Sequence, residues 1–122
     1  TYLFNFMEET KVSVDTIINY LQDAVEQKKV ISPETYLDAA QKLNMLLGAE
    51  HDALFFLQRL IAENKVKFIE SGDSVSKAKL KAEASEEYHQ SQRQKAKIER
   101  VEEFIRISKL QSRMKMEEFK GY

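Results

Sequence analysis

Apolar residues between positions 36 and 68 recur at steps of four and three, which is the heptad spacing of a helix that packs along one seam. The register runs unbroken, and all of its positions except Glu50 and Asn64 are apolar. The seam consists of Tyr36, Ala40, Leu43, Leu47, Glu50, Leu54, Leu57, Ile61, Asn64 and Phe68. We expect a central heptad helix over 33–71. Its candidate core or oligomer contacts are Tyr36, Leu43, Leu47, Leu54, Leu57, Ile61 and Phe68.

A second apolar stripe runs beside this seam and contains Leu46, Ala49, Ala53, Phe56 and Leu60. Two stripes on one helix predict burial on more than one side. The helix is therefore expected either at the centre of a bundle or between its own chain and a partner. The polar seam residue Glu50 is expected either to meet a basic residue across the bundle or to set the helix register. Gly48 within the frame indicates a close helix contact or a bend.

Breakers and capping residues divide the rest of the chain. A helix over 13–29 follows from apolar spacings of three and four, with Ser13 or Thr10 as its N-cap. Ser32 and Pro33 form the start signal of the central helix, and Gly72 fits a position just after its end. A long basic helix is predicted over 75–119.

The first residues form a dense apolar arm, 1–12, in which Tyr2, Phe4 and Phe6 are candidate partner-docking residues. Large apolar groups so close together are unfavourable in water. The arm is expected to close one end of the core or to dock on another subunit.

Composition supports few and long helices. The 122 residues include 3 Gly and 1 Pro, too few for the tight connections of a sandwich, a barrel or a βαβ fold. We expect one all-α domain over 1–122, with one shorter helix and a long antiparallel α-hairpin in a coiled-coil-like helical bundle. No apolar run approaches the roughly 18 residues of a membrane span.

Residues with metal-binding or catalytic chemistry are sparse. The sequence has no Cys and 2 His, and it lacks phosphate-loop, nucleophile-elbow and zinc-protease motifs. Glu86 and His89 form one E-x-x-H pair, whereas di-iron bundles combine two such pairs with two further Glu. We therefore expect no enzyme activity, metal, cofactor or small-molecule substrate. The absence of Cys is compatible with a reducing cytoplasm.

The formal net charge of −1 conceals an uneven distribution. Residues 1–64 carry 10 acidic and 5 basic side chains, and residues 65–122 carry 10 acidic and 14 basic ones. Basic residues of the last helix fall into two rows, one with Arg93, Lys97 and Arg100 and one with Lys95, Arg106, Lys109 and Arg113. Such rows can follow a phosphate backbone, but interleaved glutamates also fit ordinary helix-surface ion pairs.

The last third contains three short segments of a recurring kind: the Lys77–Ala84 run (KAKLKAEA) with Tyr88, Ala96-Lys97-Ile98-Glu99 and Glu103-Phe104-Ile105-Arg106. With these segments it resembles small helical proteins of tailed phages. Some of these proteins are similar to the phage recombination mediator UvsY. That resemblance implies an all-helical oligomer that binds single-stranded DNA and helps to load a recombinase against a single-strand-binding protein.

Three hypotheses follow. In the leading one, a homo-oligomeric phage recombination or replication accessory protein contacts single-stranded DNA. The candidate contacts, chosen from charge geometry, are Arg93, Lys97, Arg100, Arg106, Lys109 and Arg113. In the second, the chain is a protein-binding inhibitor or adaptor directed at a host or defence enzyme. In the third, it is a coiled-coil structural or assembly protein. We expect a cytoplasmic location, in the host cytoplasm if a phage encodes the chain, and no membrane partner.

Overall fold

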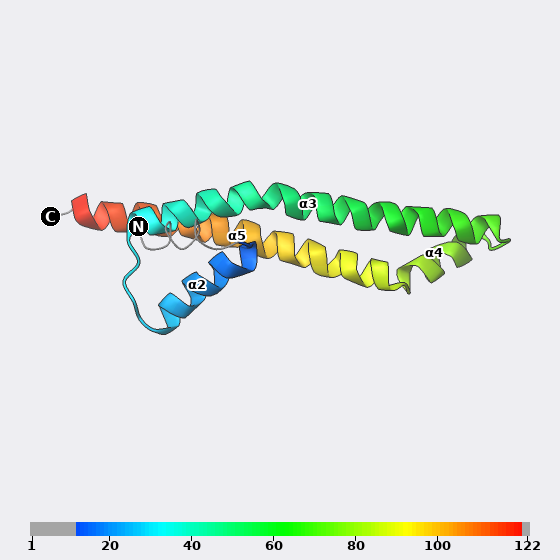
Figure 1. Cartoon of the computed structure of the whole chain (residues 1–122), viewed down its shortest axis with the longest axis horizontal. Helices are drawn as coiled ribbons and strands as arrows, with labels where there is room; N and C mark the ends of the chain where they lie inside the picture. Colours follow the sequence, from blue (N-terminus) through cyan, green and yellow to red (C-terminus); the bar gives the residue numbers. More distant parts are fainter. Residues whose placement is uncertain (1–11, 121–122) are drawn as a thin grey trace. The chain divides into compact units, whose positions relative to one another are not determined.

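The computed structural model describes residues 12–120, and all regular secondary structure in this range is helical. The elements are α2 (Val14–Glu26), α3 (Pro33–Glu70), α4 (Val75–Glu83) and α5 (Glu86–Lys120) (Figure 1). The expected all-α class with a long helical hairpin is therefore confirmed. The predicted docking arm with Tyr2, Phe4 and Phe6 lies outside the described residues.

Where the sequence predicts a single domain, the described chain divides into two compact units. The first unit combines residues 12–48 with residues 100–120, and the second unit is the continuous stretch 49–99. Both α3 and α5 contribute residues to each unit. We describe each unit by itself.

The first unit is a three-helix arrangement around one apolar core. Helix α2 lies beside the first part of α3 and the last part of α5 (Figure 1). The core joins one face of α2 to small and branched residues of the other two helices. Its buried members are Val14, Ile17, Ile18, Leu21, Ala24, Ile31, Ala39, Ala40, Leu43, Val101 and Ile105. This burial explains why the strong apolar periodicity of α2 predicts its helix correctly.

The second unit is an antiparallel helical hairpin. Glu50 near its start contacts Gln94 and Lys97 of α5. At the other end of α3, the Phe68 ring lies 5.4 Å from the Lys81 ammonium of α4. Early residues of the α3 arm thus contact late residues of the other arm, and late residues of the α3 arm contact early ones. The two helical arms are therefore antiparallel. Its buried side chains are few and mostly small: Ile61, Ala78, Ala82, Ser91 and Ile98.

Side-chain caps fix the starts of α2 and α3. The Ser13 hydroxyl accepts a hydrogen bond of 3.2 Å from the Thr16 backbone N–H, so Ser13 caps α2. Ser32 accepts the same kind of bond from Thr35 at 3.2 Å, and α3 begins at Pro33 as the sequence predicts. Each cap satisfies a backbone donor that the first helical turn leaves without a partner.

The end of α2 comes at Glu26, three residues before the predicted end at Lys29. Lys28 adopts a left-handed backbone with φ of 55°. In this conformation the N–H groups of Lys28 and Lys29 reach back to Val25 and Ala24, at 3.0 and 2.9 Å. This is a Schellman ending, in which a non-glycine residue occupies the left-handed position that usually favours glycine.

The end of α3 follows the sequence prediction. Gly72 has φ of 104°, its N–H reaches Ile69 at 3.0 Å, and the N–H of Asp73 reaches Phe68 at 3.1 Å. Glycine is suited to this left-handed position because it has no Cβ to clash with the preceding carbonyl. Ser74 then caps α4 through a 3.2 Å bond from Lys77.

The prediction of a single helix over 75–119 is wrong, because the helix is interrupted between α4 and α5. The Ser85 hydroxyl donates to the Ala82 carbonyl at 2.6 Å and accepts from the Tyr88 N–H at 3.2 Å. Ser85 thus ends one helix and caps the next, in competition with the continuous helical ladder. Glu86 and Glu87 in the first turn of α5 complement its N-terminus.

Candidate nucleic-acid interface

The six predicted DNA contacts are divided between the two units. Arg93 and Lys97 belong to the second unit, and Arg100, Arg106, Lys109 and Arg113 belong to the first. All six lie on α5, and only Lys97 is half-buried rather than exposed. Their carboxylate neighbours decide which of them can meet a phosphate without first breaking an ion pair.

Both candidate DNA contacts in the second unit have carboxylate partners. Arg93 donates to Glu86 at 2.9 Å, and both side chains are well exposed. Lys97 lies 3.2 Å from Glu50, which also accepts a 2.7 Å hydrogen bond from the Gln94 amide. The expectation that the seam carboxylate Glu50 meets a basic residue is therefore confirmed. Lys97 acts in the packing between α3 and α5 rather than as a free surface cation.

Arg106 in the first unit is also engaged. Its guanidinium donates through both Nε and Nη2 to the two carboxylate oxygens of Glu103. The hydrogen bonds from Arg106 lower the pKa of Glu103 and raise the pKa of Arg106. Both side chains are more than half exposed, so water screens this pair and limits its contribution to stability.

The three remaining candidates carry their charge without a described carboxylate partner. No ion pair joins Arg100, Lys109 or Arg113 to another residue of the 12–118 range whose side chains are described. Arg100 lies 6.0 Å from the Phe104 ring, in the geometry of a weak cation–π contact. All three are exposed.

Helical spacing places these cations on different sides of α5. Arg106, Lys109 and Arg113 follow one another at three and four residues and therefore line one side of the helix. Arg100 is nine residues before Lys109, which is half a turn out of phase at 3.6 residues per turn. The first unit thus presents a cationic ridge, defined as Arg106, Lys109 and Arg113, with Arg100 elsewhere on the helix.

The aromatic side chains of α5 that could stack on nucleic-acid bases are only partly exposed to solvent. Tyr88 and Phe104 are both half-buried. Tyr88 also contacts His89 edge to face, with ring centroids 6.2 Å apart. The side chain of Phe119 lies outside the described residues. Phosphate contacts therefore have better structural support here than base stacking.

The predicted heptad seam is buried unevenly. Leu43 is fully buried, and Tyr36 and Leu47 pack against the core of the first unit. Burial raises the pKa of the Tyr36 hydroxyl. In the second unit Ile61 is buried, whereas three other seam residues, Leu54, Leu57 and Phe68, are only half-buried.

The second stripe of α3 departs furthest from the prediction of burial on two sides. Ala49, Ala53 and Phe56 are exposed, and only Leu46 and Leu60 are partly covered. Gly48 is also exposed, and a Cβ built there would meet nothing within 4 Å. The described chain therefore supplies no close helix contact at Gly48. Of the two arrangements expected for this stripe, the one that remains is a position between its own chain and a partner.

Three serines of α5 are buried, which sequence reasoning missed. The Ser112 hydroxyl donates to the Pro33 carbonyl at 3.0 Å and so ties α5 to the start of α3 in the first unit. Ser91 satisfies its buried hydroxyl on the Tyr88 carbonyl at 2.7 Å. Ser91, Ser108 and Ser112 are all buried, and their small size lets neighbouring helices approach. Their spacing in phase with Val101 and Ile105 is the sequence signal for this face.

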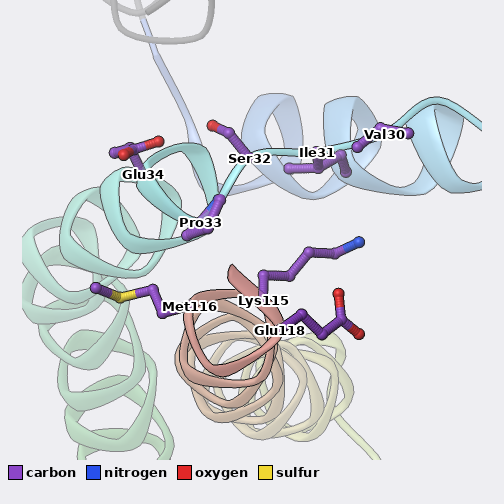
Figure 2. A pocket seen from close by; sticks show the side chains of 8 residues that line it. All are labelled: Val30, Ile31, Ser32, Pro33, Glu34, Lys115, Met116 and Glu118. Atoms are coloured by element: carbon purple, nitrogen blue, oxygen red, sulfur yellow. The ribbon is translucent and has the colours of Figure 1, made fainter. Parts of the chain in front are cut away.

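An open hollow of about 680 Å³ lies in the first unit (Figure 2). Side chains from the segment before α3 meet side chains from the end of α5 around it. The hollow is lined by Val30, Ile31, Ser32, Pro33, Glu34, Lys115, Met116 and Glu118. Figure 2 shows the Lys115 ammonium and the Glu118 carboxylate at the same side of the opening. Its lining includes both apolar side chains, such as Val30 and Met116, and charged ones, such as Glu34 and Lys115.

Groups that could hold a metal ion are absent from the part of the chain that the structure describes. No cluster of three or more His, Asp or Glu side chains occurs there. In the E-x-x-H pair, Glu86 is bonded to Arg93 and His89 is exposed. Within the same residues, none of the helices has the length and apolar character required to cross a bilayer.

Comparisons with protein-family models, with curated proteins and with solved structures find no match.

Proposed function

We propose that the chain is a non-enzymatic, oligomeric helical protein that binds single-stranded DNA through cations of α5. A phage recombination or replication accessory role, with a recombinase or a single-strand-binding protein as a further partner, fits this activity. A cytoplasmic site of action belongs to the same proposal, in the host cytoplasm for a phage-encoded chain. It is compatible with a sequence without Cys.

The observation that supports DNA binding best is the cationic ridge. Lys109 and Arg113 are exposed one helical turn apart and have no described carboxylate partner. Arg106 extends the ridge by another turn, although it must share its guanidinium with Glu103. Phosphates attract such cations because their neutralisation releases condensed counterions. Because each chain offers only two cations without a carboxylate partner, useful affinity for DNA requires several copies that bind together.

Binding of a fluorescent oligothymidine, followed by anisotropy at increasing salt, tests this proposal. We expect binding at low salt that weakens as salt rises. The double variant Lys109→Gln/Arg113→Gln should weaken binding and reduce the salt slope by about 1.4, since each lost single-strand contact removes about 0.7. The matched control Arg93→Gln removes one cation that Glu86 already neutralises, and it should leave binding nearly unchanged. Absence of binding at low salt, or equal binding by the double variant, would contradict the proposal.

A protein-binding inhibitor or adaptor is the second candidate function. The hollow beside the start of α3 favours it, because Val30 is 90% exposed there and Met116 is also exposed. Exposed apolar groups around a hollow can receive an apolar side chain of a partner. A partner complex that is stable at high salt and lost in Val30→Glu, in a protein with no affinity for oligothymidine, would favour this candidate over DNA binding.

A further inference from the structure

The outward face of α3 in the second unit exposes large apolar side chains. Phe55 and Phe56 are each 63% exposed, although phenylalanine is among the residues most often buried. Ala49 and Ala62 are also exposed on this helix, and so are Asp52 and Arg59. Phe55, Arg59 and Ala62 follow the spacing of one helical face, with Asp52 and Phe56 beside them.

Asp52, Arg59 and two alanines on this face lie symmetrically about the point between Phe55 and Phe56, whereas Glu63 on the same face has the uncharged Gly48 as its counterpart. Asp52 lies three residues before Phe55, and Arg59 lies three residues after Phe56. Ala49 and Ala62 follow at equal distances beyond the two charged residues. Asp52 and Arg59 are seven residues apart, which is nearly two full turns, so both lie along the same line of the helix. The face therefore has opposite charges at equal distances from an aromatic centre and small residues outside them.

A pattern of this kind is complementary to itself when reversed. If two such helices run antiparallel about a two-fold axis at the aromatic centre, Asp52 of each copy faces Arg59 of the other. Arg59 pairs with Glu63 of its own chain at 3.1 Å, and its remaining guanidinium N–H groups can donate to Asp52 of the second copy. The four phenyl rings then gather around the axis, and the alanines allow close approach beyond the ion pairs. In a parallel arrangement, by contrast, Asp52 would face Asp52 and Arg59 would face Arg59. A two-fold interface uses the same surface patch on both subunits, as this face requires.

We propose that a second copy of this chain covers the outward face of α3 and pairs with it antiparallel. The interface consists of Ala49, Asp52, Phe55, Phe56, Arg59 and Ala62. This inference is independent of DNA binding and concerns a surface separate from the cationic ridge. It replaces the heptad seam as the oligomer contact, because Leu43 and Ile61 of the seam are already buried within the chain.

Charge-swap variants test the pairing directly. Sedimentation equilibrium between about 1 and 300 μM covers the range of a contact limited to about 20 Å of helix. We expect a wild-type dimer. The single variants Asp52→Arg and Arg59→Asp should each raise the dimer dissociation constant about tenfold or more, because each places like charges opposite one another twice. The double variant Asp52→Arg/Arg59→Asp should restore it to within about threefold of wild type.

Two controls separate interface effects from folding effects. All of the substituted side chains are exposed in the single chain, so circular dichroism should show unchanged helix content in every variant. Arg93→Asp reverses one exposed charge on α5 and should leave the dissociation constant unchanged.

Three results would overturn the proposal. They are a monomeric wild type across the concentration range, an assembly that neither single variant weakens, and a double variant that remains as weak as the singles. The first would leave the face to a different protein. The second would place the contact between copies elsewhere, and the third would exclude the antiparallel pairing.

Discussion

The first unit buries a core of branched residues from three helices, whereas the second unit buries mainly alanine, serine and two isoleucines between the arms of a hairpin. The difference arises from α2, which adds a third apolar face to the first unit only. In the second unit, large residues such as Phe55, Phe56 and Val66 remain exposed on α3. Since apolar burial is the main favourable term in folding, the second unit has more to gain from a partner.

The largest expected effect is in the core of the first unit. Leu43→Ala should lower the free energy of unfolding by about 2–5 kcal/mol, because Leu43 is fully buried and its truncation leaves a cavity. Urea unfolding measures the loss. The matched control Met45→Ala, two residues away on the same helix, should change it by no more than about 0.5 kcal/mol because Met45 is 74% exposed. Equal losses for the two variants would show that this core is not closed.

The next effect concerns the close packing of small residues in the second unit. Ala82 is fully buried, so Ala82→Leu should destabilise the fold by about 1–3 kcal/mol through overpacking. Ala96→Leu adds the same side chain at an exposed position of the same unit and should be nearly neutral. Urea unfolding compares the pair. A gain in stability for Ala82→Leu would mean that the hairpin has room for a larger core.

A smaller effect, of the opposite sign, is expected at the end of α2. Lys28 occupies a left-handed position, so Lys28→Gly should raise the free energy of unfolding by about 1 kcal/mol. Lys29→Gly, at a neighbour without a positive φ, should give no gain. Thermal unfolding of both variants tests this. A loss for Lys28→Gly would show that side-chain contacts of Lys28 outweigh the backbone strain.

The smallest effect is electrostatic and lies in the turn of the second unit. The Lys81 ammonium, 2.7 Å from Asp73, lowers the pKa of that carboxyl below its usual 3.8, with a smaller contribution from Lys77. The pair therefore adds stability above about pH 3.8 and loses it as pH falls through the lower folded value. Titration of the Asp73 carboxyl by NMR should show the lowered pKa, and Lys81→Met should raise it more than Lys77→Met. Equal effects of the two changes would contradict the assigned cause.

Local signals in the sequence predict most of the fold. Ser32, Pro33 and Gly72 carry their structural meaning in their own backbone chemistry, and the structure places each as expected. The pairing of Glu50 with a basic residue also follows, because a charge on an apolar seam needs a partner. The sequence does not predict the break at Ser85 even though two glutamates follow it, since the alanine-rich 77–84 run before it and the glutamate- and glutamine-rich segment after it both favour helix.

The candidate site was harder to predict, because rotamers and long-range contacts decide it. Arg106 and Lys109 belong to the same basic row, yet a nearby carboxylate engages only Arg106 among these two. The hollow between the start of α3 and the end of α5 joins residues far apart in sequence, which periodicity does not bring together. The exposure of Phe56 differs from the expectation because spacing identifies an apolar stripe without showing what covers it.

Hydrogen exchange at several protein concentrations, read by mass spectrometry, tests most directly the claim that the second unit is completed by a second copy. We predict that amide protection along α3 in the 49–70 segment rises with concentration, while protection of α2 stays constant. Arg59→Asp should abolish the rise and leave α2 unaffected. Protection that is independent of concentration in both units would contradict the claim.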